Sequence, residues 1–496
     1  MVKISKVVSL KMQFNSFEFV LLFLPVSVFG YYLFNKISVI AGKLWLIAAS
    51  LVFYIYAGLP LALGLIVSIL LNYIFALYLS ASNRGRKLVF VIAILLNAAS
   101  LLYFKYHDFF IDQLSILGYA NPVEKALILP LGISFFTFQQ IAYLAFVYKA
   151  PHRHCGLVNY LLYVLFFPKL IMGPITEPDY IIPQFDDEKR KKADFNYIAA
   201  GVKTFSFGLF KKVFFADAFA AAASWGLEHS GALGSAELFL TMLSYTFEIY
   251  FDFSGYSDMA TGIAMMLNID LPINFDSPYK ALSIRDFWKR WHISLTSFLT
   301  KYVYIPLGGS RKGAVRTYIN TMIVFLVSGI WHGANWTFIL WGLLHGALSV
   351  LERIFEKTYS KLSETVRWLM TFLTVNILWL LFACESIGQW GFILKKMLLV
   401  QDAQIDHILL EKLVIPETIV FSDFINKILF GAYPQYLGGL FAMLFIAAAL
   451  AVCLIPENNY KTRNTLRASK LLPAALAFVW GVISLGGVSS FVYFGF

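Results

Sequence analysis

Long apolar segments separated by short polar loops run along almost the whole chain. Segments of the length that crosses a bilayer, about 20 residues each, recur from Phe17 to the C-terminus. The pattern predicts an all-α, polytopic integral membrane protein with roughly 11 to 13 spans of this length. Polar residues interrupt several segments, so we expect some of them to be re-entrant or interfacial.

Composition and charge support this class and exclude others. Hydrophobic residues make up 59% of the chain and charged residues only 14%, which leaves no soluble domain of useful size. The net charge of +11 gathers between the apolar segments, as loops on the cytoplasmic side require. No contiguous basic domain is present to bind nucleic acid. Cys155, Cys384 and Cys453 are scattered, so neither a disulfide framework nor a metal site is implied.

The extreme N-terminus conflicts with the topology that the first spans predict. Basic loops such as the one that follows Lys36 alternate with loops poor in charge, which places the N-terminus outside the cytoplasm. Three lysines among residues 1–11 oppose this orientation. We therefore expect residues 1–11 to be an extension ahead of a true start at Met12, and residues 12–496 to form a single membrane domain.

A histidine lies in the middle of a long apolar run without formal charge. Its immediate sequence, SGIWHGANW over 328–336, places Trp331 beside His332. An ionisable side chain at membrane depth is costly and is therefore a functional candidate, and a neutral histidine there is suited to take a proton from a hydroxyl group. Asn335 and Trp336 follow at i+3 and i+4 and are expected to line the same pocket wall on one helix. The alternative is a core histidine bonded to a carbonyl group.

A second histidine follows a mixture of aromatic and cationic residues. Residues 283–295 read SIRDFWKRWHISL, which is unsuited to a lipid-facing helix and predicts an amphipathic or re-entrant helix near the interface. Arg290 and Trp291 precede His292 there. We interpret His292 and His332 as the catalytic pair, because acyl transfer to an alcohol needs a base and benefits from a positively polarised group.

Two carboxylates are spaced i, i+4 within the otherwise apolar segment 244–258. Glu248 and Asp252 would share a helix face and repel one another if both were ionised. Either one is protonated or a basic partner lies between them. Two roles stay open: a polar contact between helices without chemistry, or the lining of a substrate channel.

Other histidine-bearing features are expected to be structural. The loop 149–155, KAPHRHC, has metal-binding residue types but lacks the defined scaffold and fourth ligand of a metal site, so we expect a basic loop beside the membrane. His345 falls on a different helix face from His332.

No Gly-x-Ser-x-Gly motif is present, which favours direct acyl transfer over a serine acyl-enzyme.

Several motifs together resemble the membrane-bound O-acyltransferase family. They are FFPKLIMG at 166–173, YFDFSGYSD at 250–258, RWHISL at 290–295 and GIWHG at 329–333. The opening residues 14–19 and the closing residues 491–496 are similar to those of the bacterial membrane subunits that O-acetylate alginate and peptidoglycan. The resemblance covers essentially the whole chain from Met12.

The resemblance implies an O-acetyltransferase of the bacterial cytoplasmic (inner) membrane, surrounded by membrane lipids, with a central tunnel between the two faces. His332 matches the family's invariant histidine and His292 its second conserved polar position. Acetyl-coenzyme A is the expected donor, with no metal, and basic residues near the cytoplasmic face would pair with its phosphates. The expected acceptor is a hydroxyl group of an exopolysaccharide or of peptidoglycan, reached with a separate periplasmic or extracellular acetyltransferase partner. The residues expected to line the donor and substrate are Trp331, Asn335, Trp336, Arg290, Trp291, Asp252 and Glu248.

The sequence departs from this pattern at one place, and two other functions stay open. Residues 382–385 read FACE where relatives commonly have Phe-Arg-Ala, which removes a cation and any anchoring role for it. One alternative is D-alanyl transfer to teichoic acid, although the spans after about residue 390 make the chain long for that subgroup. The other is a polysaccharide or ion transporter in which the carboxylates and histidines form a path, although no inverted repeat is visible.

Overall fold

The described part of the chain is helical throughout. The computed structural model describes residues 12–118, 127, 129–399, 405, 407–413, 434–487 and 491–492. Within these residues the regular structure is helical and contains no strand, which confirms the predicted all-α class. Residues 1–11, the expected extension, lie outside the described residues.

The chain folds into two compact units. Unit 1 combines the N-terminal part as far as Gly208 with residues 256–273 and the C-terminal part from Arg463. Unit 2 combines 209–255 with 274–462. The long helix α11 (Ser235–Met266) contributes its first two thirds to unit 2 and its last turns to unit 1.

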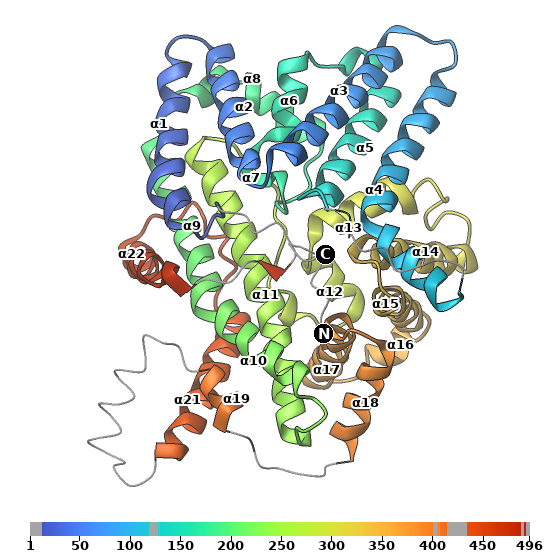
Figure 1. The fold of residues 1–496 in the computed structure, drawn as a ribbon, viewed down its shortest axis with the longest axis vertical. Coiled ribbons are helices and arrows are strands. Elements are labelled where there is room, and N and C mark those ends of the chain that lie inside the picture. Colours follow the sequence, from blue (N-terminus) through green and yellow to red (C-terminus); the bar gives the residue numbers. More distant parts are fainter. Residues whose placement is uncertain are drawn as a thin grey trace. The chain divides into compact units, whose positions relative to one another are not determined.

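Unit 1 is built mainly from the N-terminal helices, and Figure 1 shows α1 and α2 as an adjacent pair. Gly30 permits this contact, because a Cβ atom there would lie 2.3 Å from the Trp45 ring. Gly201 of α9 and Gly262 of α11 permit a second close crossing, since a Cβ on Gly201 would lie 2.6 Å from the Gly262 carbonyl oxygen. The elements are a π-helical turn Glu18–Phe23, α1 (Leu24–Asn35), α2 (Val39–Ile55), α3 (Leu59–Ala81), α4 (Arg86–Ile116), α5 (Ile133–Lys149), a 3₁₀ turn Pro151–Arg153, α6 (Leu157–Leu165), α7 (Phe167–Leu170), α8 (Pro178–Asp186), a 3₁₀ turn Glu188–Lys191, most of α9 (Phe195–Phe210) and α22 (Ala468–Ile483) with a 3₁₀ turn Ser484–Gly487.

Unit 2 is organised around the hairpin of α14 and α15, which pack closely along their length. Gly329 and Gly342 permit this contact: a Cβ atom on either would lie 2.4 Å from a carbonyl oxygen of the other helix. The elements are a π-helical turn Lys211–Ala216, α10 (Asp217–Glu228), α11, a 3₁₀ turn Pro278–Lys280, α12 (Ile284–Arg290), α13 (Ile293–Leu299), a π-helical turn Thr300–Tyr304, α14 (Ala314–His332), α15 (Trp336–Ile354), α16 (Glu356–Tyr359), α17 (Glu364–Ala383), α18 (Ile387–Leu398), α19 (His407–Lys412) and α21 (Pro434–Leu454).

Several helices begin at a polar residue whose side chain satisfies a free backbone N–H group of the first turn. Ser38 accepts from the Ala41 N–H group at the start of α2. Ser283, Asn335, Ser363 and Ser386 act in the same way at the starts of α12, α15, α17 and α18. Caps of this kind explain where the helices begin within a chain that is apolar almost throughout.

The protein is a multi-pass membrane protein. Among the described residues seven helices are long and apolar enough to cross a membrane: Glu18–Asn35, Leu59–Ala81, Arg86–Ile116, Ala314–His332, Trp336–Ile354, Glu364–Ala383 and Ala468–Gly486. Two apolar helices, Val39–Ile55 and Gly439–Leu454, are shorter. The count is lower than the 11 to 13 expected, because other apolar segments form helices that are broken, as at α6 and α7, or that carry several carboxylates, as α11 does.

The segment 283–295 was expected to form one amphipathic or re-entrant helix, and it forms parts of two short ones. α12 ends at Arg290 and α13 starts at Ile293. Between them, His292 has φ of 44°, in the left-handed region that residues other than Gly and Asn rarely adopt. The break therefore fixes the position of the second candidate histidine.

Candidate active site

His332 is the last residue of α14. The helix ends there because Gly333 is extended and packs against Phe338, whose ring a Cβ atom on Gly333 would meet at 2.1 Å. The chain then turns, and Asn335 caps the next helix by accepting from the Thr337 N–H group at 3.1 Å. The Asn335 amide also donates to the Glu385 carbonyl oxygen at 2.9 Å.

This turn corrects the expectation that Asn335 and Trp336 line a wall on the same helix as His332. The i+3, i+4 rule applies within one helix, and here α14 has ended before Asn335 while Trp336 opens α15. Trp336 is 52% exposed. Glycine at position 333 was the signal for the break, since glycine commonly follows the end of a helix.

Aromatic rings surround the buried His332 side chain. The ring centroid of His332 lies 4.9 Å from Trp331, 5.2 Å from Trp341 and 5.3 Å from Phe382. Trp341 belongs to α15 and Phe382 to α17, and both are buried. No local spacing in the sequence links these two residues to His332, so the sequence analysis missed them. Such an enclosure keeps water away from the imidazole.

His292 is fully buried, and its orientation is set by Asn274. The Asn274 Oδ1 atom accepts from the Ser294 N–H group at 3.2 Å and from the Ser294 hydroxyl at 2.8 Å. The His292 Nδ1 atom lies 3.2 Å from the same oxygen. Because this oxygen is an acceptor, Nδ1 carries the proton and donates it to Asn274. Burial lowers the pKa of His292 to about 3, so the ring is neutral.

The structure brings the two histidines together through Trp331. The Trp331 ring centroid lies 4.9 Å from His332 and 6.0 Å from His292. Phe253 of α11 contacts the other histidine, with centroids 4.7 Å apart. The forty residues between the two histidines are thus folded so that one indole contacts both imidazoles.

His345 was expected on another face of the helix that carries His332, but it belongs to the next helix. It is buried on α15, and its Nδ1 atom accepts from the Trp288 indole N–H group at 3.1 Å. Its ring also lies 4.8 Å from Trp341. His345 therefore supports the aromatic residues around His332 from the next helix.

The carboxylates of α11 have a basic partner within unit 2. The Lys212 ammonium lies 2.7 Å from Asp252 and 2.9 Å from Asp217. Lys212 and Asp252 are each 1% exposed. Glu248 lies one turn before Asp252 and is also buried. Of the two alternatives that the spacing left open, a basic partner is present for Asp252, and Lys212 links α11 to α10.

Arg290 and Trp291 support the break between α12 and α13. The Arg290 guanidinium donates to Asp286 at 3.0 Å and to the Asp276 carbonyl oxygen at 3.4 Å. Trp291 is buried, with its ring centroid 4.8 Å from that of Trp379. Neither residue lines the pocket described next.

A pocket of about 250 Å³ in unit 2, here called the cationic pocket, opens beside these residues. Arg285, Lys289 and Arg353 supply its positive charge, and hydroxyl groups and apolar side chains complete the wall: Trp288, Leu295, Thr296, Leu299, Thr300, Tyr304, Thr321, Val324, Phe325, Ser328, Ser349 and Val350. Arg285 pairs with Glu356 at 3.3 Å. Lys289 and Arg353 are exposed and have no ion-pair partner within the described ranges.

The cationic pocket is connected to His332 through packed side chains. Ser328 lines it one turn before His332 on α14. Trp288 also lines it, and its ring lies 5.5 Å from Trp341, which contacts His332. The sequence analysis missed this pocket, because its cations come from α12 and from the far end of α15.

The described residues contain no cluster of three His, Cys, Asp or Glu side chains that could hold a metal ion. In the loop 149–155, Cys155 instead interacts with the Tyr143 hydroxyl, with Oη and Sγ 3.1 Å apart.

Comparisons with known proteins identify the family of the chain. Residues 135–388, which include both histidines, match the membrane-bound O-acyltransferase family. The chain is 36% identical to the peptidoglycan O-acetyltransferase of Helicobacter pylori over 97% of each chain. It is 36% identical to the probable alginate O-acetylase AlgI of Pseudomonas aeruginosa over 76% of this chain and 73% of that protein. A teichoic acid D-alanyltransferase of Streptococcus thermophilus is 26% identical over 49% of this chain and 62% of its own. The chain is therefore an O-acyltransferase that belongs to the membrane-bound O-acyltransferase family.

Proposed function

We propose that this O-acyltransferase uses acetyl-coenzyme A on the cytoplasmic side of the inner membrane to O-acetylate peptidoglycan. The observation that carries the proposal is the pairing, within unit 2, of the aromatic-enclosed His332 with the cationic pocket. Peptidoglycan is favoured as the acceptor because the Helicobacter pylori relative aligns over 97% of both chains, against 76% and 73% for AlgI at the same identity. An exopolysaccharide such as alginate is the second candidate, supported by that equal identity.

His332 acts in this proposal as the general base. Its neutral imidazole takes the proton of the acceptor hydroxyl as that oxygen attacks the thioester carbonyl carbon. The carbon–sulfur bond then breaks, and the coenzyme A thiolate leaves and takes up the proton. One ester is formed and one thioester is consumed, so no further reactant is needed. The rings of Trp331, Trp341 and Phe382 exclude water that would hydrolyse the thioester.

His292 acts as a positioning residue. Its Nδ1 atom is held by Asn274, and its ring contacts Trp331. It thereby fixes the indole that packs against His332. Asn335 and Asp252, which were expected to line the substrate, would also act by positioning, because Asn335 donates to the Glu385 carbonyl oxygen and Asp252 binds Lys212.

The cationic pocket would hold a phosphate-bearing part of the donor. Lys289 and Arg353 have no ion-pair partner among the described residues, which leaves them available to bind phosphate oxygens. Its volume of about 250 Å³ is below the roughly 300–1,000 Å³ of pockets that enclose a whole ligand. Part of the coenzyme would therefore lie outside it.

A partner protein on the far side of the membrane would complete the transfer to the glycan. The acceptor is a polymer outside the cytoplasm, whereas the donor is cytoplasmic. A membrane step followed by a soluble acetyltransferase step would connect them. The names of the relatives give peptidoglycan and alginate as the polymers, and the partner is inferred from the location of such an acceptor.

The test measures O-acetyl groups on purified peptidoglycan and on surface polysaccharide. A deletion strain is complemented with the wild-type chain, His332→Ala, His292→Ala or the control His229→Ala, with membrane levels matched. His229 is an exposed histidine of unit 2 outside the site. We expect peptidoglycan acetylation to disappear with His332→Ala, to fall with His292→Ala and to persist with His229→Ala.

The same strains separate the alternatives. Loss of exopolysaccharide acetylation alone would replace peptidoglycan by that acceptor. Loss of D-alanyl esters with unchanged acetylation would contradict the donor assignment. Unchanged esters combined with reduced polymer export would favour the transporter.

A further inference from the structure

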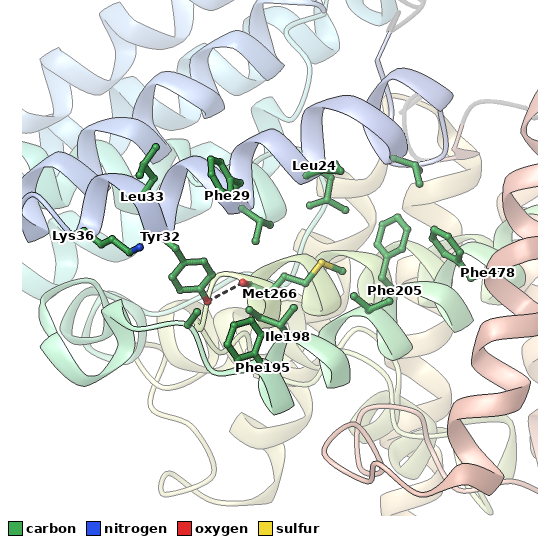
Figure 2. Close-up of a pocket in the computed structure, with 15 residues that line it drawn as sticks. Leu24, Phe29, Tyr32, Leu33, Lys36, Phe195, Ile198, Phe205, Met266 and Phe478 are labelled. Atoms are coloured by element: carbon green, nitrogen blue, oxygen red, sulfur yellow. Dashed lines mark hydrogen bonds between the residues drawn. The ribbon is translucent and has the colours of Figure 1, made fainter.

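Unit 1 contains an apolar groove of about 620 Å³, shown in close-up in Figure 2. It is lined by Val20, Leu24, Pro25, Val28, Phe29, Tyr32, Leu33, Lys36, Ala193, Phe195, Ile198, Val202, Phe205, Met266 and Phe478. These residues come from the π-helical turn before α1, from α1 and Lys36 directly after it, from α9 and the loop before it, from the end of α11 and from α22. The groove is separate in composition and in unit from the site around His332.

The groove is elongated along α1. Its lining runs from Val20, in the π-helical turn before α1, to Lys36 at the end of α1, which is roughly 24 Å at the rise of an α-helix. This length is enough to span one leaflet, about 15 Å of a hydrocarbon core about 30 Å thick. α1 also belongs to the candidate span Glu18–Asn35. The groove therefore follows the direction and the depth of lipid acyl chains.

Polar groups in the wall of the groove are few, and the main one is satisfied. The Tyr32 hydroxyl donates to the Met266 carbonyl oxygen at 2.9 Å, a bond drawn in Figure 2. Phe29 is 71% and Phe195 81% exposed. Aromatic and aliphatic side chains with such exposure suit contact with hydrocarbon rather than with water.

A cation lies at one end of the groove. Figure 2 places Lys36 at the end opposite Phe205 and Phe478. Lys36 is exposed, directly follows the span, and has no ion-pair partner among the residues that the structure describes. Ala193, which lines the groove, follows the exposed Lys192 along the chain. Positive charge is thus placed where a span meets the membrane surface, which is the level of phosphate groups.

We propose that this groove is a binding site for an anionic diacyl phospholipid, with an acyl chain along α1 and the phosphate group at Lys36. Hydrocarbon from any lipid could fill the apolar wall, but the cation selects negative charge. One such cation near the membrane surface is worth about a fivefold preference. The proposal does not depend on the acyl-transfer reaction of unit 2.

The experiment counts lipids bound to the purified full-length protein. The protein in neutral detergent is titrated with phosphatidylglycerol or phosphatidylcholine and examined by native mass spectrometry. We expect one phosphatidylglycerol to bind about fivefold more tightly than phosphatidylcholine. Lys36→Gln should abolish the preference, and Val28→Trp should weaken both lipids by filling the groove.

Matched controls keep the test specific. Lys87→Gln removes an exposed lysine at the start of α4, and Val26→Trp adds the same ring to α1 at a residue outside the groove. Both should bind lipid like the wild type, and all four variants should keep the wild-type melting temperature. Equal binding of both lipids by the wild type would overturn the proposal. Unchanged lipid binding by Lys36→Gln and Val28→Trp would also overturn it. The same holds if the protein forms a dimer through this groove and Val28→Trp prevents that dimer.

Discussion

The cationic pocket of unit 2 and the apolar groove of unit 1 use the same kinds of helix in different ways. The pocket combines Arg285, Lys289 and Arg353 with hydroxyl groups and is linked by packed tryptophans to a buried histidine. The groove has one cation, at its end. A ligand that must be bound, altered and released needs the first kind of site, whereas a lipid that stays needs the second. The helices around the pocket and around the groove are alike in length and in apolar character. The polar side chains are therefore what distinguishes the two proposed functions.

Buried polar groups sharpen this difference. Within unit 2 several of them have a side-chain partner: Asn274 contacts His292, Trp288 contacts His345, and Asp252 contacts Lys212. Unit 1 also buries polar groups, for example Lys169, which donates to Gln139 at 2.7 Å. Lys169 does not line the groove. Fixed polar groups are the means by which a site is organised before the substrate arrives.

The strongest test of the comparison is His332→Gln. Loss of the base should reduce the rate of acetyl transfer by about 10²–10⁴-fold, while the lipid preference of the groove should stay unchanged. The rate is followed as coenzyme A release in proteoliposomes that contain the full protein, and the preference by native mass spectrometry. A rate within threefold of the wild type would contradict the role of His332.

The next effect concerns stability. Lys212→Met leaves two carboxylates without their buried cation and should destabilise the protein by about 3–5 kcal/mol. Lys36→Gln at the end of the groove should change stability by less than about 0.5 kcal/mol. Thermal unfolding in detergent gives both values.

A double variant provides the control for this prediction. Lys212→Met combined with Asp252→Leu removes the unpaired carboxylate together with its partner, so part of the lost stability should return. A double variant less stable than Lys212→Met alone would show that Asp252 has a further essential contact.

A moderate effect is expected at the cationic pocket. Lys289→Gln and Arg353→Gln should each raise the KM for acetyl-coenzyme A by about 5–10-fold, because each removes a charged contact to phosphate. The value of kcat should change little, since neither side chain reaches His332. Lys36→Gln serves as the matched control. A fall in kcat with unchanged KM would contradict a role in donor binding.

The sequence predicted the class of the fold and proposed His332 and His292 as candidate site residues, but it did not predict the side chains around them. Apolar segments and histidines in unusual surroundings are local properties, so both can be recognised along the chain. Trp341 and Phe382 reach His332 from other helices, so no spacing along the chain reveals them. The end of α14 at His332 was missed for a different reason: the Gly333 signal was present, but the helical rule was extended across it.

The charged residues show the same limit. The i, i+4 spacing of Glu248 and Asp252 indicated either a protonated carboxylate or a basic partner. The partner of Asp252, Lys212, comes from a π-helical turn far away in the sequence and could not be identified from the spacing. Arg290, expected at the substrate, is bound by Asp286. Its neighbour Lys289 lines the cationic pocket instead. A one-residue step on a short helix turns a side chain through about 100°, which residue type alone does not resolve.

The smallest expected effect is a difference in pH dependence between the two units. Burial holds the pKa of His292 at about 3, below its value of about 6.5 in an unfolded chain. Below pH 6.5 the unfolded chain therefore binds a proton that the folded protein does not, and stability falls by up to about 1.4 kcal/mol per pH unit until pH approaches 3. His292→Asn, a residue tolerated at φ of 44°, should flatten the fall in melting temperature between pH 6.5 and 5. The lining of the groove contains no histidine or carboxylate, so phosphatidylglycerol binding should be the same at both pH values. An equal pH slope in the wild type and in His292→Asn would show that His292 takes up its proton in the folded protein.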